Sequence, residues 1–236
     1  LYAYTGEPDV RRSLLFRGRL QVIESNRIVV KLNNRQQNPK VFVNSLYALE
    51  HDTSDVGTVS AIRSLMAFAT SSATKRQLLL GLREPQADTT LQLTRSYHPD
   101  YDDILLRQKQ ARDYFLLVGP PGTGKTSMAL RFIVEEELSS SHGEAVLLLS
   151  YTNRAVDEMC GMLVDAGIDF LRLGNETSCD TRFSGYLLEA FLGDAPKLDV
   201  IRQRIHQKRV VVSTTATMQS RPFLFQLKRF ALCVVD

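Results

Sequence analysis

The stretch Gly119-Pro120-Pro121-Gly122-Thr123-Gly124-Lys125-Thr126 decides the fold of this 236-residue chain. It fits the phosphate-loop pattern G-x-x-x-x-G-K-[ST] at every fixed position. Its glycines let the backbone turn tightly and bring N–H groups close to a polyphosphate. The pattern places Lys125 for the β- and γ-phosphates and the Thr126 hydroxyl for a magnesium ion. The sequence therefore predicts a site for a nucleotide with Mg²⁺.

The residues on either side of this loop favour a functional reading of it. Tyr114–Val118 is apolar and predicts a buried strand that leads into the loop. Ser127–Leu138 carries apolar residues at helical spacing and predicts the helix that leaves it. A glycine- and proline-rich turn that binds no nucleotide is the alternative, and the strand–loop–helix context argues against it.

Strands and helices alternate in the rest of the C-terminal half. The expected strands are Ala145–Leu149, Phe170–Leu173, Val210–Val212 and Leu232–Val235, and the expected helices are Asn153–Asp165 and Pro196–Lys208. Continuously apolar strands are typical of a parallel sheet that is covered on both faces. The alternation predicts an α/β fold, a parallel P-loop NTPase sheet with right-handed crossovers.

The N-terminal half has a different pattern. Strand-forming segments are expected at Ser13–Glu24, Arg27–Leu32 and Val41–Val43, and helices at Thr53–Phe68, Lys75–Leu82 and Asp102–Gln110. Glu84–Asp100 contains prolines and small polar residues and is typical of a linker. We therefore expect a small β unit over 1–46, a helical stalk and linker over 47–100, and a motor domain over 101–236.

The distribution of charge indicates the class of protein less specifically than the phosphate loop does. The net charge is only +3, but the basic residues between positions 10 and 40 are Arg11, Arg12, Arg17, Arg19, Arg27, Lys31, Arg35 and Lys40, with Glu24 as the sole acid. Such a cluster suits a nucleic-acid backbone, and a solvated sheet face explains it equally well.

The three cysteines have no metal-ligand spacing. We expect Cys160 and Cys233 to be core thiols in a reducing, cytoplasmic setting. No segment is long and apolar enough to cross a membrane. Leu1 is not an initiator and Asp236 ends an apolar segment, so we expect a piece of a longer protein.

A second polar segment, Ser150–Asp157, follows the strand Ala145–Leu149 and opens a helix. Ligands of open α/β sheets bind at such strand ends, and a helix N-terminus suits phosphate. A plain helix cap at Thr152 or Asn153 explains the same residues and is the commoner case.

Together, the loop and the segment Leu149–Asp157 resemble motifs I and Ia of superfamily 1 helicases. The nearest group is the superfamily 1B branch of the nonsense-mediated-decay helicase and the immunoglobulin mu-binding helicase. Leu171–Gly174 is similar to a segment of that branch, Val211–Ala216 resembles motif Ic, and Ala231–Asp236 resembles the start of motif II. The resemblance implies a RecA-like motor domain that a small β-barrel and a helical stalk precede.

The resemblance also implies roles for individual residues. Lys125 and Asp236 would be catalytic, and Thr126 and Asp236 would hold Mg²⁺. ATP would be bound by Gly119, Pro120, Pro121, Gly122, Thr123, Gly124, Lys125, Thr126 and Ser127. Contacts with single-stranded nucleic acid, DNA or RNA, would come from Tyr151, Thr152, Asn153, Thr214 and Thr215. The full protein would be an ATP-dependent helicase or translocase moving 5′ to 3′.

Two departures from the family pattern stand out. The glutamine that reads adenine in this family falls by spacing near Asp100 or Tyr101, and no glutamine is there. The glutamate that follows the motif II aspartate and the second motor domain would lie beyond Asp236, so we expect this chain to bind nucleotide weakly with almost no turnover. Another phosphate-loop ATPase, such as an AAA+ remodeller, and a non-catalytic binding module remain as alternatives.

Overall fold

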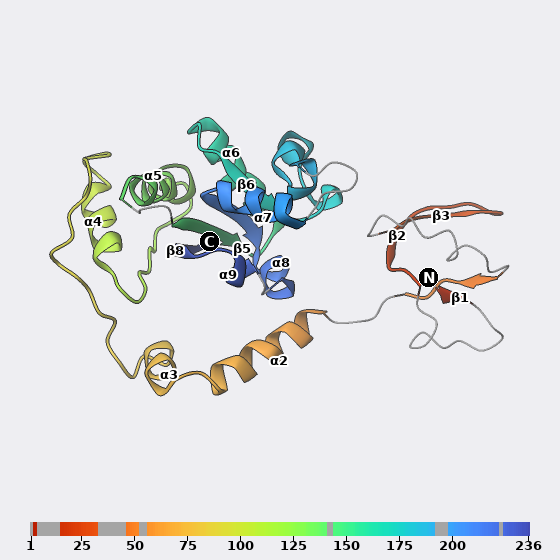
Figure 1. The fold of residues 1–236 in the computed structure, drawn as a ribbon, viewed down its shortest axis with the longest axis horizontal. Helices are drawn as coiled ribbons and strands as arrows, with labels where there is room; N and C mark the ends of the chain where they lie inside the picture. Colours follow the sequence, from red (N-terminus) through yellow and green to blue (C-terminus); the bar gives the residue numbers. More distant parts are fainter. Residues whose placement is uncertain are drawn as a thin grey trace. The chain divides into compact units, whose positions relative to one another are not determined.

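The computed structural model describes residues 2–3, 15–32, 46–51, 56–140, 144–191, 198–221 and 224–236 (Figure 1). The chain forms two compact units, Leu1–Val56 and Gly57–Asp236.

The N-terminal unit contains two short antiparallel strand pairs. β1 (Tyr2–Ala3) pairs with β4 (Tyr47–Ala48), and β2 (Gly18–Ile23) pairs with β3 (Ile28–Leu32). An ion pair of 2.7 Å between Arg27 and Glu24 spans the turn between β2 and β3. The strands expected at Ser13–Glu24 and Arg27–Leu32 are thus confirmed within narrower bounds. The one expected at Val41–Val43 lies outside the described residues, and the described pairs do not establish a barrel.

Two helices follow at the start of the second unit. α2 spans Val56–Ala69 and α3 spans Ala73–Leu79, in agreement with the apolar spacing. The Ser72 side chain caps α3 by accepting a hydrogen bond of 3.3 Å from the Lys75 N–H. The apolar side chains on α2 are largely exposed, for example Leu65 at 67%.

A four-stranded parallel sheet forms the centre of the second unit. Its strands are β5 (Ala145–Ser150), β6 (Phe170–Leu173), β7 (Val210–Thr214) and β8 (Phe230–Val235), in the order β6-β7-β5-β8. Every residue of the first three strands is buried. This is the parallel α/β sheet of a P-loop NTPase domain, as the sequence predicts.

Helices cover both faces of the sheet (Figure 1). α5 (Leu130–Ser140) and α6 (Asn153–Asp165) pack on the face of Val146 and Leu148. α7 (Leu198–Gln207), α8 (Thr215–Ser220) and α9 (Leu224–Leu227) pack on the face of Leu147 and Leu149. Successive side chains of a strand point to opposite faces, so the continuous apolar sequence of β5 contributes to the hydrophobic cores on both sides of the sheet.

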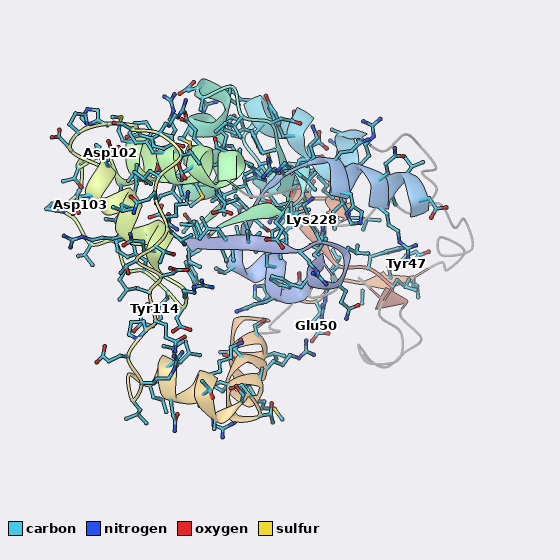
Figure 2. All side chains as sticks on the ribbon, turned by 60° about the vertical axis from the view of Figure 1, so that its left-hand side comes forward. Tyr47, Glu50, Asp102, Asp103, Tyr114 and Lys228 are labelled. Carbon is cyan, nitrogen blue, oxygen red and sulfur yellow. The ribbon has the colours of Figure 1, made fainter. Side chains whose placement is uncertain are left out.

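Shorter elements complete the unit. Three short 3₁₀-helices follow β6, namely η3 (Glu176–Ser178), η4 (Thr181–Tyr186) and η5 (Leu188–Phe191). Lys228 (Figure 2) is buried and donates to the carbonyls of Ile205 and His206, 3.0 and 2.9 Å away, at the end of α7. A cation satisfies the last carbonyls of a helix. None of the helices in the described ranges has the length and apolar character of a membrane span.

Two expectations about apolar segments are wrong. Tyr114–Val118 is irregular, and it makes no backbone hydrogen bond to a strand among the described residues. Its side chains at Tyr114, Leu116 and Val118 are 41%, 75% and 91% exposed, and those of Phe115 and Leu117 are only half-buried, so the segment is not the buried strand that the sequence predicts. Cys233 is exposed rather than a core thiol, because β8 alternates between half-buried and exposed positions at the edge of the sheet.

Candidate nucleotide site

The phosphate loop adopts a conformation that depends on its glycines. Gly122 and Gly124 have φ angles of 80° and 74°, in the left-handed region that other residues rarely adopt. The helix after the loop begins with a widened turn, η2 (Lys125–Ala129), in which the Ala129 N–H donates to the Gly124 carbonyl at 3.0 Å. η2 runs directly into α5, so the helix expected at Ser127–Leu138 is confirmed with an earlier start and a later end.

Lys125 folds back over its own loop. Its Nζ donates to the carbonyl oxygens of Gly119 and Pro120 at 2.6 and 2.7 Å. The Thr123 hydroxyl also donates to the Pro120 carbonyl at 2.9 Å. The ammonium group is therefore already inside the loop that would hold the phosphates.

Thr126 and Asp236 are 110 positions apart in the sequence and lie close together in the structure. Asp236 follows β8, and its N–H donates to the Leu149 carbonyl at 2.9 Å, which extends the strand pairing by one residue. The Thr126 Oγ1 lies 3.5 Å from the Asp236 Oδ2. The structure thus brings together the two side chains that the sequence predicts as magnesium ligands.

These two oxygens fit Mg²⁺ in kind and number. Mg²⁺ prefers hard oxygen ligands and is held by one or two protein groups together with water and phosphate oxygens. Within the described ranges, no three His, Cys, Asp or Glu side chains gather into a cluster of their own that could hold a metal. A metal held by Thr126 and Asp236 would therefore take its remaining ligands from water and from the oxygens of a bound phosphate.

A cavity of about 910 Å³ adjoins the loop. The loop side is lined by Pro121, Gly122, Gly124, Lys125, Thr126 and Ser127, and the opposite side by Arg154, Asp157, Glu158, Gly161, Met162, Asp165, Asp180, Arg182 and Phe183. Ligand pockets typically measure roughly 300–1,000 Å³, so the space is sufficient for a nucleotide. All but three of the residues predicted to bind nucleotide line this one cavity, and Gly119, Pro120 and Thr123 contact Lys125 or the loop backbone.

An ion pair with a buried arginine lies behind the cavity wall at Asp157, and the sequence did not predict it. Arg172 on β6 is fully buried and lies 2.8 Å from Asp157 on α6. Asp157 also accepts from the Asp180 N–H at 3.3 Å, and Asp180 pairs with Arg182 at 2.9 Å. The hydrogen bond from Arg182 holds the pKa of Asp180 below its ordinary value. An arginine in a buried strand was the only sequence signal for this arrangement.

The residues predicted to contact nucleic acid lie at neighbouring strand ends. Ser150 is paired in register with Thr214, so the segments that follow β5 and β7 emerge side by side. Tyr151 is 84% exposed there. Thr152 caps α6 by accepting from the Ala155 N–H at 3.2 Å, and Thr214 caps α8 by accepting from the Thr217 N–H at 3.1 Å.

The two remaining residues of that group differ in accessibility. Asn153 is the exposed first residue of α6, and Thr215 is the half-buried first residue of α8. The predicted group therefore shares one edge of the sheet, and the hydroxyls of its two capping threonines are already hydrogen-bonded.

At the spacing where the family carries its adenine-reading glutamine, the structure places Tyr101. Its hydroxyl donates to the Thr123 carbonyl of the phosphate loop at 3.0 Å. The neighbouring Asp100 is exposed. The sequence does not predict this direct contact with the loop, and its only signal is the spacing of Tyr101 from Gly119.

Comparison with known proteins agrees with this geometry. A family model described as an AAA domain matches residues 100–199. The chain is 28% identical over 190 residues to the DNA replication ATP-dependent helicase/nuclease JHS1 of Arabidopsis thaliana, covering 76% of this chain and 14% of that protein. It is 27% identical over 197 residues to the DNA replication ATP-dependent helicase/nuclease DNA2 of Mus musculus, covering 77% and 18%. The human DNA2 protein is 27% identical over 202 residues, covering 79% and 19%.

The chain is similar to superfamily 1 helicases. These similarities support a helicase-like ATPase motor domain. The narrower prediction of the nonsense-mediated-decay branch is not confirmed, because these relatives are helicase/nucleases of DNA replication. The chain spans less than a fifth of the length of the relatives named here.

Proposed function

We propose that this chain contains the first motor domain, preceded by an accessory β unit and stalk, of an ATP-dependent superfamily 1 helicase that acts on single-stranded nucleic acid. The observation that carries the proposal is the meeting of Thr126 and Asp236 beside a complete phosphate loop. The loop comes from one end of the domain and the aspartate from the other, and their convergence is what hydrolysis of a nucleoside triphosphate requires. The similarity to ATP-dependent helicase/nucleases supports the same conclusion.

Each residue of the site has a defined task in this proposal. The loop amides and Lys125 bind the β- and γ-phosphates. Thr126 and Asp236 hold the magnesium ion, which when bound supplies positive charge to offset that of the phosphates. Pro121 and Ser127 complete the wall around the nucleotide, and the Pro120 carbonyl holds Lys125 and Thr123.

The nucleic-acid part of the proposal concerns the edge of the sheet at β5 and β7. Tyr151, Thr152, Asn153, Thr214 and Thr215 would position a strand backbone there, and such contacts do not specify its sequence. DNA is the favoured substrate because the relatives are named as DNA replication enzymes. Movement from 5′ to 3′ is part of the proposal and follows from the helicase resemblance.

We also propose the division into a β unit over 1–46, a stalk and linker over 47–100 and a motor domain over 101–236. The compact unit Leu1–Val56 supports an independent N-terminal part, although it extends past residue 46 and includes β4, which pairs with β1. The linker region contains no helix or strand between α3 and α4 (Asp102–Gln110) apart from one isolated bridge at Ala87.

Binding of ATP with Mg²⁺ to this chain, measured by calorimetry, tests the nucleotide site. Lys125→Ala should weaken binding by about 10- to 100-fold, because hydrogen bonds from a charged donor contribute about 1.5–3 kcal/mol. Lys75→Ala on α3 is the matched control and should leave the affinity unchanged, since Lys75 is exposed and distant in sequence from the loop. Equal affinity for the wild type and Lys125→Ala would favour a non-catalytic module.

The same preparation tests the substrate class in a second arm. Fluorescence anisotropy with single-stranded DNA and RNA of equal length, at one stated salt concentration, should show tighter binding to DNA, weakened by Tyr151→Ala. The salt must be fixed because phosphate contacts make such affinities strongly salt-dependent. Preference for RNA, or no effect of Tyr151→Ala, would contradict this part of the proposal.

A further inference from the structure

Tyr101 holds the phosphate loop from outside the nucleotide cavity. Its ring packs edge-on between His98 and Phe132, with ring centroids 5.4 and 5.8 Å away. Its hydroxyl reaches 3.0 Å from the Thr123 carbonyl oxygen and donates a hydrogen bond to it. Tyr101 is absent from the lining of the cavity, so its effect on a nucleotide would pass through the loop backbone.

The direction of the Thr123 carbonyl fixes the direction of the next amide. In a planar trans peptide the C=O of one residue and the N–H of the next point opposite ways. When Tyr101 holds the Thr123 carbonyl, it therefore turns the Gly124 N–H away from itself. That N–H makes no hydrogen bond to the described residues. It is available to a ligand oxygen on the cavity side.

Gly124 itself fits closely against this tyrosine. A Cβ at position 124 would lie only 2.5 Å from the Tyr101 hydroxyl oxygen, and the φ of 74° already disfavours any other residue. The carbonyls of Gly119 and Pro120, earlier in the loop, are held by Lys125. The carbonyl oxygens of Gly119, Pro120 and Thr123 thus bind protein donors instead of facing the phosphates.

We propose that Tyr101 is a positioning residue that fixes the Thr123–Gly124 peptide in the orientation that binds phosphate. The inference rests on the proposed nucleotide site and adds the group that shapes it. Tyr101 stands where the family carries its adenine-reading glutamine, and its role in this proposal differs from base recognition. Its single hydroxyl hydrogen is donated to the Thr123 carbonyl of the loop.

The segment that carries Tyr101 is itself firmly held. The Asp102 carboxylate (Figure 2) accepts hydrogen bonds from the Tyr97 N–H at 2.8 Å, from the His98 N–H at 3.0 Å and from the Ser96 hydroxyl. The hydrogen bond from Ser96 is the largest cause that lowers the pKa of Asp102. This closes a tight turn just before α4 and fixes the backbone from which Tyr101 projects.

A second carboxylate anchors the same segment to the helix that follows the loop. Glu136 on α5 is 2% exposed and accepts from the Thr94 hydroxyl at 2.6 Å, from the Tyr97 hydroxyl at 2.9 Å and from Lys109. The segment from Thr94 to Tyr101 therefore bridges α5 and the loop that precedes it. We call this segment the brace.

Tyr101→Phe removes only the hydroxyl and keeps the ring in its aromatic contacts. Hydrogen exchange of the Met128 and Ala129 amides, which donate to the Gly124 carbonyl, should become about three- to tenfold faster in the nucleotide-free chain, in line with the loss of one net hydrogen bond. We call this rate loop exchange. The affinity for ATP with Mg²⁺ should fall by a similar factor, with little change in the melting temperature. Tyr97→Phe is the matched control, since it also removes one hydroxyl from the brace, but from the Glu136 side.

The two variants should behave in opposite ways. Tyr97→Phe should lower the melting temperature and leave loop exchange and nucleotide affinity close to the wild type. Unchanged loop exchange in Tyr101→Phe would overturn the role given to its hydroxyl, whether or not the chain binds nucleotide. If Lys125→Ala has no effect on binding while Tyr101→Phe still speeds loop exchange, the proposed function fails and the role of Tyr101 in holding the loop survives.

Discussion

The sheet interior and the chain that leads into the phosphate loop are held by different forces. In β5, β6 and β7 every residue is buried, and the strands are paired by backbone hydrogen bonds. The approach segment, which we define as Arg83–Val118, contains one helix, α4, and a single isolated bridge. Apolar packing and backbone pairing hold the first region. The second is held by side-chain carboxylates together with one small apolar cluster around Leu105.

Four carboxylates along the approach segment or facing it make these contacts. Asp113 accepts from Arg83 at 2.9 Å and from the Gln86 N–H at 2.8 Å, and Asp88 accepts from Thr90 and Arg112. Asp102 and Glu136 hold the brace. Carboxylates titrate in acid and apolar side chains do not, so the two regions should respond differently to substitution and to pH.

The largest contrast is expected from one leucine in each region. Leu148 on β5 is fully buried and Leu116 in the approach segment is 75% exposed. Leu148→Ala should lower the free energy of unfolding by about 3 kcal/mol, through lost burial and the cavity left behind. Leu116→Ala should change it by less than about 0.5 kcal/mol. Denaturant unfolding followed by circular dichroism measures both, and similar losses would mean that Leu116 is packed in solution.

A smaller effect is expected from acid, and it should be confined to the approach segment. Hydrogen bonds from Thr90 and then Arg112 lower the pKa of Asp88 to about 2. The Gln86 N–H, against the opposing effect of burial, lowers that of Asp113. A carboxylate with a lowered pKa stabilises the folded state above its ordinary value, and this stabilisation is lost as the pH falls through the folded-state value. Below the ordinary value of 3.8, hydrogen exchange should therefore rise over 83–105 before it rises in β5.

Glu136→Gln sharpens this comparison. Burial alone would raise the pKa of Glu136, but hydrogen bonds from Lys109, Thr94 and Tyr97 outweigh it and leave the pKa below its ordinary value of 4.5. The variant cannot titrate, so its stability should fall less than that of the wild type as the pH drops below 4.5. Parallel acid profiles for the two proteins would show that Glu136 does not contribute to the pH dependence.

The smallest effect concerns chemical reactivity without a change in stability. Cys160 is fully buried on α6, and burial raises the pKa of its thiol to about 12. Cys233 on β8 is exposed, and partial burial of its thiol also raises its pKa, so the contrast between the two rests on access. A maleimide reagent should modify Cys233 at least about 100-fold faster than Cys160, because the buried thiol reacts only after unfolding. Mass spectrometry of the modified peptides measures the ratio, and equal rates would mean that α6 opens locally.

The same contrast explains which elements the sequence predicted. β6 and α6 have the predicted bounds, and β5 differs from its expected range by one residue, because their apolar residues find cores at the expected period. Tyr114–Val118 is as apolar as β5, but it has no strand to pair with among the described residues. Apolar composition indicates that a segment can be a strand, and only its neighbours decide whether it becomes one.

The sequence predicts the parts of the site that lie within short sequence motifs. The loop residues could be named from the pattern, and the resemblance to motif II placed Asp236 beside Thr126, which the 3.5 Å separation is consistent with. The Arg172–Asp157 pair and the Tyr101–Thr123 contact join residues 15 to 22 positions apart through the fold, and no spacing rule connects them. Such contacts follow from tertiary structure and leave no periodic signal in the sequence.

The position of Lys125 has a consequence for the thermodynamics of the loop. Its ammonium group donates to the carbonyl oxygens of Gly119 and Pro120, which take the place of water around part of the charge. Removing a charged group from water is costly, and here part of that dehydration accompanies folding. When a phosphate binds, Lys125 exchanges carbonyl oxygens for phosphate oxygens. The free-energy cost of removing water from its ammonium group on binding is therefore smaller than for a fully hydrated lysine.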